Sequence, residues 1–569
     1  MNKKWEILPK ISDDFIGQFP EIDPIILQLL YNRGLKTQEE IDNFLYPDYS
    51  QDLYDPFLFQ DMEKAVKRII RAIEQQEKIM IYGDYDADGV TSTTVLISAL
   101  KKLGVKNIDS YIPDSNREEY GLNQTAIEQI IRDGYKLIIT CDCGSSNKKE
   151  VEVANKSGVD VIITDHHLMP QNPQEIPPAY AIINPCFDKN YPFKDLAGVG
   201  VAFKLVQALF RQLSNQISNL EAFEKWLLDL VAIGTVVDIK PLLNENRVLV
   251  KHGLIVLNKT FRLGLRALVN EAGLILGNLD THHLSWQMGP RLNAARRLDK
   301  ADLALGLLLT ESKEEANCLA AKLNKINSER QRIVDLAFQR VKSDLEAKPD
   351  TKVVAIYGQN WPAGILGLLS QRILEEYNRV AVVMTDIRDI EIKGSGRGPG
   401  GFNLVEALSQ FKEYFSSYGG HRQACGFTLK NREKVNEFIN LFTKSVGEKL
   451  AGLDLTPKLF IETEIELEKV SWDLMETLET FAPFGEGNPK PLFLAKNLII
   501  ENLQWVGQNG QHLKIYVSGG KKMIGFSLNN HPSQDLRIGD KIDVVFEISE
   551  NIWNGQKEIQ MRMVDIRKI

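Results

Sequence analysis

A chain of 569 residues is too long for a single hydrophobic core, and its length predicts about three or four domains. Its composition, 43% hydrophobic and 25% charged, is typical of a soluble globular protein, and it contains no apolar run long enough to span a bilayer. The net charge of −8 argues against general attraction to nucleic acid, so any nucleic-acid site must be local.

Residues 1–50 have the pattern of a small helical segment. An apolar stretch at 25–30 is followed by a capping-box pattern that begins at Thr37. After a further helical stretch, 62–75, the sequence changes to a short apolar run typical of a buried strand.

Three carboxylates lie close together where this first buried strand is expected to end. The run stops at Gly83, and three aspartates follow at alternate positions, Asp84, Asp86 and Asp88, before a helix-like segment at 91–103. Such carboxylates repel one another, and the carboxyl end of a parallel strand is where open α/β sheets bind ligands. A divalent cation would remove the repulsion, and oxygen ligands favour Mg²⁺ or Mn²⁺. The alternative is a solvated acidic turn.

The same layout recurs twice along the chain. One apolar run leads to Asp142, between two cysteines, and the next leads to Asp165, His166 and His167. Helix-length segments separate the runs, which predicts a parallel sheet with the chemistry along one rim. Taken singly, Asp142 is equally a helix cap and the histidines ordinary loop residues. Their shared placement at strand ends favours a metal site.

Three features follow between the first α/β region and the second. Asp238 emerges from an apolar segment and by itself indicates only a cap or a surface acid. Residues 289–299, which include Arg291, concentrate positive charge in an acidic chain. Residues 312–347 contain no Gly or Pro and keep a helical stripe of apolar residues. One helix of that length would reach about 50 Å, so we expect it to connect two lobes.

Beyond this helix, strand and helix patterns alternate again and two glycine-rich turns are expected. These turns cover 393–401 and 418–426, and they include Ser395, Arg397, Gly419, Gly420 and His421. Glycine lets backbone N–H groups approach an anion, and each turn brings a cation or a histidine beside it. Together they predict phosphate binding. From residue 459 onward, short strands separated by turns predict a small β-barrel.

The acidic and histidine motifs together resemble those of the DHH phosphoesterase superfamily. The resemblance is carried by 83–89 and 165–167, extends over nearly the whole chain, and is strongest to the bacterial exonucleases specific for single-stranded DNA. It implies an α/β fold in five parts: a helical segment (1–50), a parallel-sheet DHH catalytic domain (51–310), a connector helix (311–348), a DHH-associated α/β domain (349–455) and an oligonucleotide-binding (OB) barrel (456–569).

The resemblance also implies a site for two divalent ions, Mn²⁺ or Mg²⁺. The expected metal ligands are Asp84, Asp86, Asp88, Asp142, His166 and Asp238, and the expected catalytic residues are Asp84, Asp142 and His167. We expect substrate contacts from Arg117, Arg291, Ser395, Arg397, Gly419, Gly420 and His421. Either Asp142 or Asp238 would bridge the ions, and His167 would either stabilise the transition state or assist proton transfer.

We therefore expect a 5′→3′ exonuclease that hydrolyses single-stranded DNA by a two-metal mechanism, releases 5′ mononucleotides and acts in recombination and repair. One alternative is a DHH-type phosphodiesterase for short oligoribonucleotides or cyclic dinucleotides, although such substrates have no use for a remote binding domain. Another is a replication scaffold on a decayed nuclease fold, although such a protein should have lost its metal ligands. Two positions depart from the family pattern: Pro362, where relatives commonly have histidine, and Gly398, where they often have serine.

The expected partner is single-stranded DNA, with single-strand-binding protein and a helicase as further candidates. Five cysteines, an odd number, predict a reducing compartment. We accordingly expect a cytoplasmic monomer that does not bind membranes.

Overall fold

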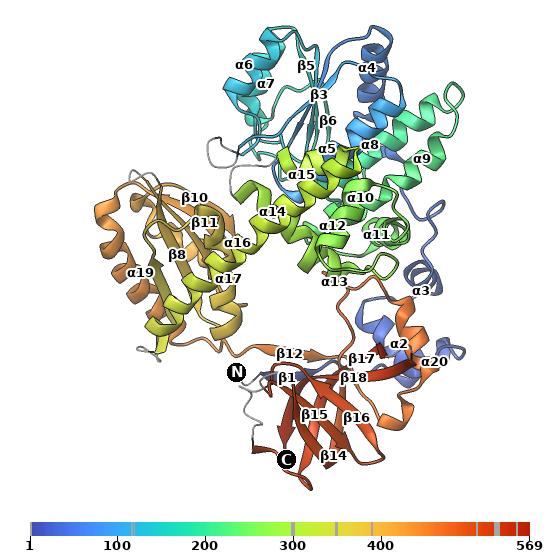
Figure 1. The fold of residues 1–569 in the computed structure, drawn as a ribbon, viewed down its shortest axis with the longest axis vertical. Coiled ribbons are helices and arrows are strands. Elements are labelled where there is room, and N and C mark those ends of the chain that lie inside the picture. The colour runs from blue at the N-terminus through green and yellow to red at the C-terminus, as the bar shows by residue number, and fades with distance from the viewer. Residues whose placement is uncertain are drawn as a thin grey trace. The chain divides into compact units, whose positions relative to one another are not determined.

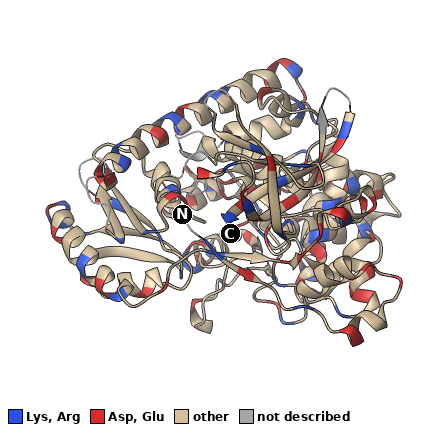
Figure 2. Cartoon of the chain, turned by 90° about the horizontal axis from the view of Figure 1, so that it is seen from below, with Lys and Arg blue, Asp and Glu red and all other residues tan. Residues whose placement is uncertain are grey.

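The computed structural model describes residues 3–114, 118, 120–297, 302–346, 351–387, 391–507, 510–528, 535–553 and 556–569. The chain divides into two compact units, and Figure 1 labels their helices and strands. The first comprises Pro47–Asp335 with Pro483–Asn488, and the second comprises Met1–Tyr46, Leu336–Ala482 and Pro489–Ile569. Figure 2 shows Lys and Arg interspersed with Asp and Glu over the helices. None of the helices in the described ranges has the length and apolar character needed to cross a membrane.

A five-stranded parallel sheet organises the first unit, with strand order β3-β2-β4-β5-β6. The strands are β2 (Ile79–Gly83), β3 (Ile108–Tyr111), β4 (Leu137–Cys141), β5 (Asp160–Thr164) and β6 (Ala181–Ile183). Both β2 and β4 are buried along their whole length, which explains why they form continuous apolar runs in the sequence. The predicted parallel sheet is therefore confirmed.

Alternate residues of the sheet pack against two helical layers. Ile79 and Ile81 of β2 contact one core, whereas Met80 and Tyr82 contact the other, as the two-residue period of a strand requires. The first layer contains α4 (Met62–Glu74), α5 (Ala87–Lys102) and α8 (Gly198–Leu213), and the second contains α6 (Gln124–Arg132) and α7 (Lys148–Lys156). The unit continues with α9 (Leu220–Trp226), α10 (Leu228–Val237), α11 (Asn244–Leu257), α12 (Leu263–Glu271), α13 (Thr281–His283), the π-helix Leu284–Met288, α14 (Gly289–Arg297) and α15 (Asp302–Leu309).

The expected connector is one continuous helix, α16 (Lys313–Glu346), of 34 residues. At 1.5 Å per residue it is about 50 Å long. Its residues up to Asp335 belong to the first unit and those from Leu336 belong to the second.

The second unit contains a mixed five-stranded sheet with strand order β10-β11-β9-β8-β7. Its strands are β7 (Val353–Tyr357), β8 (Val380–Ile387), β9 (Glu391–Arg397), β10 (Phe415–His421) and β11 (Ala424–Leu429), and its helices are α17 (Leu366–Tyr377), α18 (Leu404–Ser409) and α19 (Val435–Leu450). Only β7 and β8 pair in parallel, and the other described pairs are antiparallel.

The prediction of two glycine-rich turns is wrong, because most of both segments is strand. Gly394 and Gly396 lie inside β9, where the neighbouring strand covers them. A Cβ on Gly394 would lie 2.1 Å from the Phe427 ring, and one on Gly396 would lie 2.8 Å from Cys425 Sγ. Glycine at these two positions therefore leaves space for the side chains of β11, whereas the sequence analysis expected glycines of a turn.

The chain ends in a closed barrel. Its five strands are β14 (Phe493–Val506), β15 (His512–Val517), β16 (Lys521–Gly525), β17 (Lys541–Trp553) and β18 (Gln556–Lys568), and pairing of β14 with β17 closes the sheet. The short strand β13 (Thr463–Glu464) pairs with β14 outside this ring. Helix α20 (Trp472–Thr480) precedes β14. The N-terminal segment contains α1 (Asp13–Gln18), α2 (Pro24–Asn32) and α3 (Gln38–Leu45), and its strand β1 (Lys4–Ile7) pairs with β12 (Lys458–Ile461). The expected α/β class with a terminal barrel is confirmed.

Candidate metal centre

The turn after β2 brings its aspartates together through a close backbone approach. A Cβ on Gly89 would lie 2.4 Å from the carbonyl oxygen of Asp84, so a larger residue would force the turn apart. Asp86 caps the N-terminus of α5 and accepts hydrogen bonds from the backbone N–H groups of Asp88 and Gly89. Strand, turn and helix thus fix the three carboxylates at the carboxyl end of β2.

Asp88 is buried and is held by the N-terminus of α8. The backbone N–H groups of Gly198 and Val199 donate to its two carboxylate oxygens at 2.6 and 2.8 Å. A Cβ on Gly198 would lie 2.6 Å from the Cβ of Asp142, so glycine lets this helix end approach both carboxylates. The N-terminus of α8 is therefore part of the site.

His166 lies at the centre of the cluster. Its Nε2 is 2.9 Å from Oδ1 of Asp142, 3.6 Å from Oδ2 of Asp238 and 3.8 Å from Oδ2 of Asp88. Asp142 follows β4 with a φ of +62°, a left-handed conformation that aspartate tolerates better than most residues. One nitrogen is thus surrounded by carboxylates from three separate parts of the chain.

The structure brings all six expected metal ligands into this one cluster. Three sets each place one potential ligand atom per residue within 4.8 Å of the others: Asp84 with Asp86 and Asp142; Asp88 with His166 and Asp238; and Asp142 with Asp165, His166 and His167. Oδ1 of Asp142 and Oδ2 of Asp238 are buried carboxylate oxygens, with His166 Nε2 at 2.9 and 3.6 Å from them and Lys240 Nζ at 3.5 Å from the second. A divalent cation would satisfy such oxygens, so the donor set fits Mn²⁺ or Mg²⁺.

Crowding and burial perturb the acidity of the cluster. Burial, together with the charges of neighbouring aspartates, raises the pKa values of Asp88 and Asp142 well above their ordinary range. Burial and the charge of Asp86 raise the pKa of Asp238 to about 6, against the opposing effect of Lys240. The protein alone therefore disfavours the fully ionised cluster, which bound cations would stabilise.

His167 is oriented by Asp165 and Tyr120. Its Nδ1 lies 2.8 Å from Oδ1 of Asp165 and 3.0 Å from the Tyr120 hydroxyl, which also donates to the backbone carbonyl of Asp142. Burial opposes protonation of His167, but the interaction with Asp165 outweighs it and raises the pKa of the imidazole. Burial also opposes ionisation of Asp165, but its hydrogen bonds with His167 and Ser145 lower its pKa. The histidine beside the cluster therefore holds a proton more readily than an ordinary imidazole does.

Sequence reasoning missed four residues that contact this centre. Lys240 Nζ lies 2.7 Å from Nδ1 of His166, and Asn293 Oδ1 accepts the backbone N–H of Ala87 at the start of α5. The other two are Asp165, which was seen at a strand end but not assigned a role, and Tyr120. Asp165 at the end of a predicted strand and Asn293 within the basic 289–299 segment each carried a signal, whereas Tyr120 and Lys240 carry none in their local sequence.

The residues expected to contact substrate fall in three places. Arg117 lies outside the described residues. Arg291 lies in α14, where its guanidinium donates to the carbonyl of Gln287 and the side chain of Asn324. Ser395, Arg397, Gly419, Gly420 and His421 belong to the sheet of the second unit.

The register of that sheet places several of these residues on one face. Ala424 of β11 lies between His421 of β10 and Arg397 of β9. Two residues further along β11, Gly426 lies between Gly419 of β10 and Ser395 of β9. Directly opposed residues in antiparallel strands point to the same side. An arginine, a serine and a histidine therefore share a face that glycines keep open.

Models of three protein families match successive parts of the chain. The N-terminal domain of the DHH family matches residues 78–235, the DHHA1 domain matches 350–448 and the RecJ OB domain matches 461–565. The sequence is 37% identical over 574 residues to the single-stranded-DNA-specific exonuclease RecJ of Bacillus subtilis, covering 99% of this chain and 70% of the relative. The chain belongs to the RecJ family. RecJ of Escherichia coli K12 is 32% identical over 588 residues, with 99% of both chains covered.

Solved RecJ structures agree with this assignment. RecJ of Thermus thermophilus in complex with Mn²⁺ superposes with a TM-score of 0.83 at 27% identity, covering 100% of this chain and 80% of that one. Its complex with Mg²⁺ gives a TM-score of 0.78 at 26% identity, covering 100% of this chain and 78% of that one. The resemblance to the DHH superfamily is thereby confirmed, while the exact boundaries of the five predicted segments stay a prediction.

Proposed function

We propose that this chain is a single-stranded-DNA-specific exonuclease that uses Mn²⁺ or Mg²⁺. The observation that carries the proposal is the cluster of five aspartates and His166 at the carboxyl edge of a parallel sheet in a member of the RecJ family. The small-substrate phosphodiesterase is not favoured, because the chain also matches the RecJ OB domain and aligns with RecJ nucleases over nearly its full length.

The residues of the cluster would divide the work as follows. The carboxylates of Asp84, Asp86, Asp88, Asp142 and Asp238, with His166, would hold two divalent cations. When bound, these cations would supply a nucleophile at neutral pH and neutralise charge on the attacking and leaving oxygens. Asp142 belongs to two of the three ligand sets, which favours it over Asp238 as the residue shared between the ions.

His167 would act beside the metals on the reacting phosphate. Its raised pKa keeps the imidazole protonated over a wider pH range, and Asp165 fixes its orientation. A protonated imidazole would stabilise the additional negative charge of the transition state, which favours this role over abstraction of a proton.

Substrate binding would come from the second unit. The face shared by Ser395, Arg397 and His421 suits a phosphate group, because an arginine fork and a hydroxyl can surround phosphate oxygens. The OB barrel would also bind single-stranded DNA. We further infer 5′→3′ polarity with release of 5′ mononucleotides, a role in recombination and repair, a cytoplasmic monomer, and single-strand-binding protein and a helicase as partners.

Digestion of three end-labelled substrates tests the proposal. Single-stranded DNA, duplex DNA and RNA of one sequence are incubated with the full-length protein and either Mn²⁺ or Mg²⁺. We expect the single-stranded DNA to be degraded to mononucleotides and the duplex to persist, with no activity in EDTA. Faster hydrolysis of a dinucleotide than of long single strands would favour the small-substrate alternative.

A further inference from the structure

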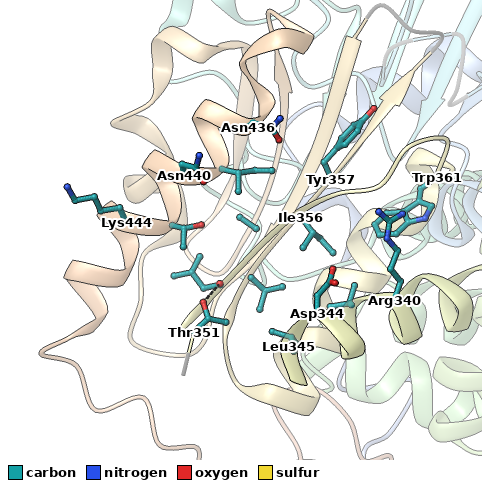
Figure 3. A pocket seen from close by; sticks show the side chains of 16 residues that line it. Arg340, Asp344, Leu345, Thr351, Ile356, Tyr357, Trp361, Asn436, Asn440 and Lys444 are labelled. Atoms are coloured by element: carbon teal, nitrogen blue, oxygen red, sulfur yellow. Dashed lines mark hydrogen bonds between the residues drawn. The ribbon is translucent and has the colours of Figure 1, made fainter. Parts of the chain in front are cut away.

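A cavity of about 660 Å³ runs along the outer edge of β7 in the second unit. Figure 3 shows β7 between two helical walls. Residues Arg340, Asp344 and Leu345 of α16 form one wall, and Asn436, Asn440 and Lys444 of α19 form the other. None of the residues lining this cavity belongs to the metal cluster.

The floor of the cavity is an unpaired strand edge. Within the described ranges, β7 pairs with β8 on one side and is the last strand of its sheet on the other. All five residues of β7, from Val353 to Tyr357, line the cavity. The edge of a sheet presents backbone N–H and C=O groups that can pair with another extended chain. The cavity therefore gives access to a template for one further strand.

The α19 wall carries groups suited to a peptide backbone. Asn436 and Asn440 are exposed and lie one helical turn apart, so their amides stand in a row beside β7. A carboxamide donates and accepts hydrogen bonds at once, as a peptide group does. Ile439, half-buried between the two asparagines, adds apolar surface to this wall, whereas Val341 and Leu345 are buried beneath the opposite one.

The charged side chains that line the cavity favour an acidic peptide. Arg340 and Lys444 are exposed on opposite walls, against a single carboxylate in the lining, that of Asp344. This lining is positive, although the whole chain carries a net charge of −8. A segment with carboxylates near its ends complements the two cations better than a neutral or basic one.

We propose that β7 is a strand-addition site for an extended, acidic peptide segment of a partner protein. The segment pairs with the outer edge of β7 and directs alternate side chains toward α16 and α19. Its carboxylates lie beside Arg340 and Lys444, and the asparagine amides bond to its backbone. This surface is separate from the proposed nuclease chemistry, so hydrolysis of short single strands is unchanged when it is occupied.

Peptide selection tests the proposal even though the partner is unidentified. A phage-displayed library of random peptides is selected on the full-length protein and counter-selected on the Lys444→Glu variant. We expect enrichment of peptides that combine carboxylates with alternating apolar residues. Their synthetic copies should bind the parent about tenfold or more tightly than Lys444→Glu, because a charge-assisted hydrogen bond is lost. The matched control is Lys449→Glu, an exposed residue of the same helix outside the cavity.

Amide hydrogen exchange then locates the bound peptide. Binding should slow exchange within residues 353–357, and a copy with alternate backbone amides N-methylated should neither bind nor protect. Asn440→Ala should weaken binding and leave the hydrolysis of a short oligonucleotide unchanged. Enrichment of neutral or basic peptides only, equal binding by Lys444→Glu and Lys449→Glu, protection elsewhere, or no enrichment at all would each overturn the assignment.

Discussion

Nδ1 of His166 lies 2.7 Å from Nζ of Lys240, while Nε2 of the same imidazole lies 2.9 Å from Oδ1 of Asp142. Burial and the charge of Lys240 lower the pKa of His166 to about 3, so the imidazole is neutral near pH 7. An ammonium can only donate, so Nδ1 accepts from Lys240 and Nε2 carries the proton. Metal binding through Nε2 requires that proton to leave, and the contact with Lys240 must then change.

Replacing Lys240 by methionine should tighten metal binding. The substitution removes a positive charge beside the cluster. It also removes the hydrogen bond that favours the His166 tautomer with its proton on Nε2, the nitrogen that would bind the metal. We expect Mn²⁺ to bind about tenfold more tightly, given the strength of charge interactions at this range. Electron paramagnetic resonance of free Mn²⁺ measures the change without recourse to activity. Lys240→Arg is the control, and unchanged affinity in Lys240→Met would contradict the inference.

Replacing Asp142 by asparagine should abolish hydrolysis while the fold is retained. Asparagine tolerates the φ of +62° and keeps the shape of the side chain, but removes a charge shared by two ligand sets. We expect a loss on the order of a thousandfold in rate, with little change in the binding of single-stranded DNA. The assay is a metal titration of exonuclease activity with fluorescence anisotropy alongside. Activity within tenfold of the parent at saturating metal would rule out the bridging role.

Asp238 should make the metal-free protein less stable as pH rises. Its pKa is about 6 in the folded chain and 3.8 ordinarily, so between these values the folded state binds more protons than the unfolded state. The free energy of unfolding contributed by this group therefore falls as pH increases from about 4 to 7. The free energy of unfolding of Asp238→Asn should therefore exceed that of the parent by an amount that grows over this range, to about 3 kcal/mol at most.

Urea unfolding in EDTA at several pH values measures this difference. Subtracting the two proteins cancels the opposite pH dependence of His166, whose lowered pKa destabilises the fold as pH falls. A difference that is constant with pH would mean that Asp238 titrates normally. Saturating Mn²⁺ should reverse the order of stability, because the cations need the carboxylate.

The barrel should bind single strands by stacking on exposed aromatic residues. Trp505 and Phe526 are 36% and 43% exposed, whereas Tyr516 is half-buried and the side chain of Trp553 lies outside the described residues. Alanine at Trp505 or Phe526 should weaken binding to long single strands by about 1–3 kcal/mol for each base released. Cleavage of very short strands is the internal control. Equal losses on long and short strands would indicate that these residues only support the fold.

Point variants suit this test better than deletion of the barrel. The N-terminal strand β1 pairs with β12, and Trp5 Nε1 donates to the carboxylate of Asp565 at 2.8 Å. Removing residues 459–569 would therefore unfold part of the N-terminal segment as well. Loss of function in such a deletion would not report on DNA binding alone.

The nuclease should prefer a strand that begins with a 5′ phosphate. One oligonucleotide with a 3′ label is prepared with a 5′ phosphate, a 5′ hydroxyl or a blocked 5′ end. We expect the phosphorylated form to be degraded fastest and the blocked form slowest, because in the proposed binding face the arginine fork of Arg397 would hold the phosphate. Arg397→Lys should reduce the preference and Arg397→Ala should remove it. Equal rates on all three forms, or release of the 3′ label first, would refute the polarity.

The parts of the centre that sequence could predict are those built from contiguous chain. A strand, a turn and a helix place Asp84, Asp86 and Asp88, and the apolar runs before Asp142 and His166 show that these residues end neighbouring strands. The clamp on Asp88 by the N-terminus of α8, 110 residues away, leaves no local trace. The sequence predicted a turn at Gly394 and Gly396, because glycine occurs both in turns and in closely packed strands. Only the positions of Phe427 and Cys425 in the folded chain show that these two glycines belong to a strand.

The hold that Gly198 and Val199 exert on Asp88 bears on when the enzyme becomes active during its own synthesis. The carboxylates after β2 leave the ribosome long before α8, and Asp238 follows later still. A partly translated chain therefore has acidic residues that are free to bind metal weakly, but no assembled centre. We therefore expect no cleavage of DNA by a nascent chain until synthesis has passed Asp238.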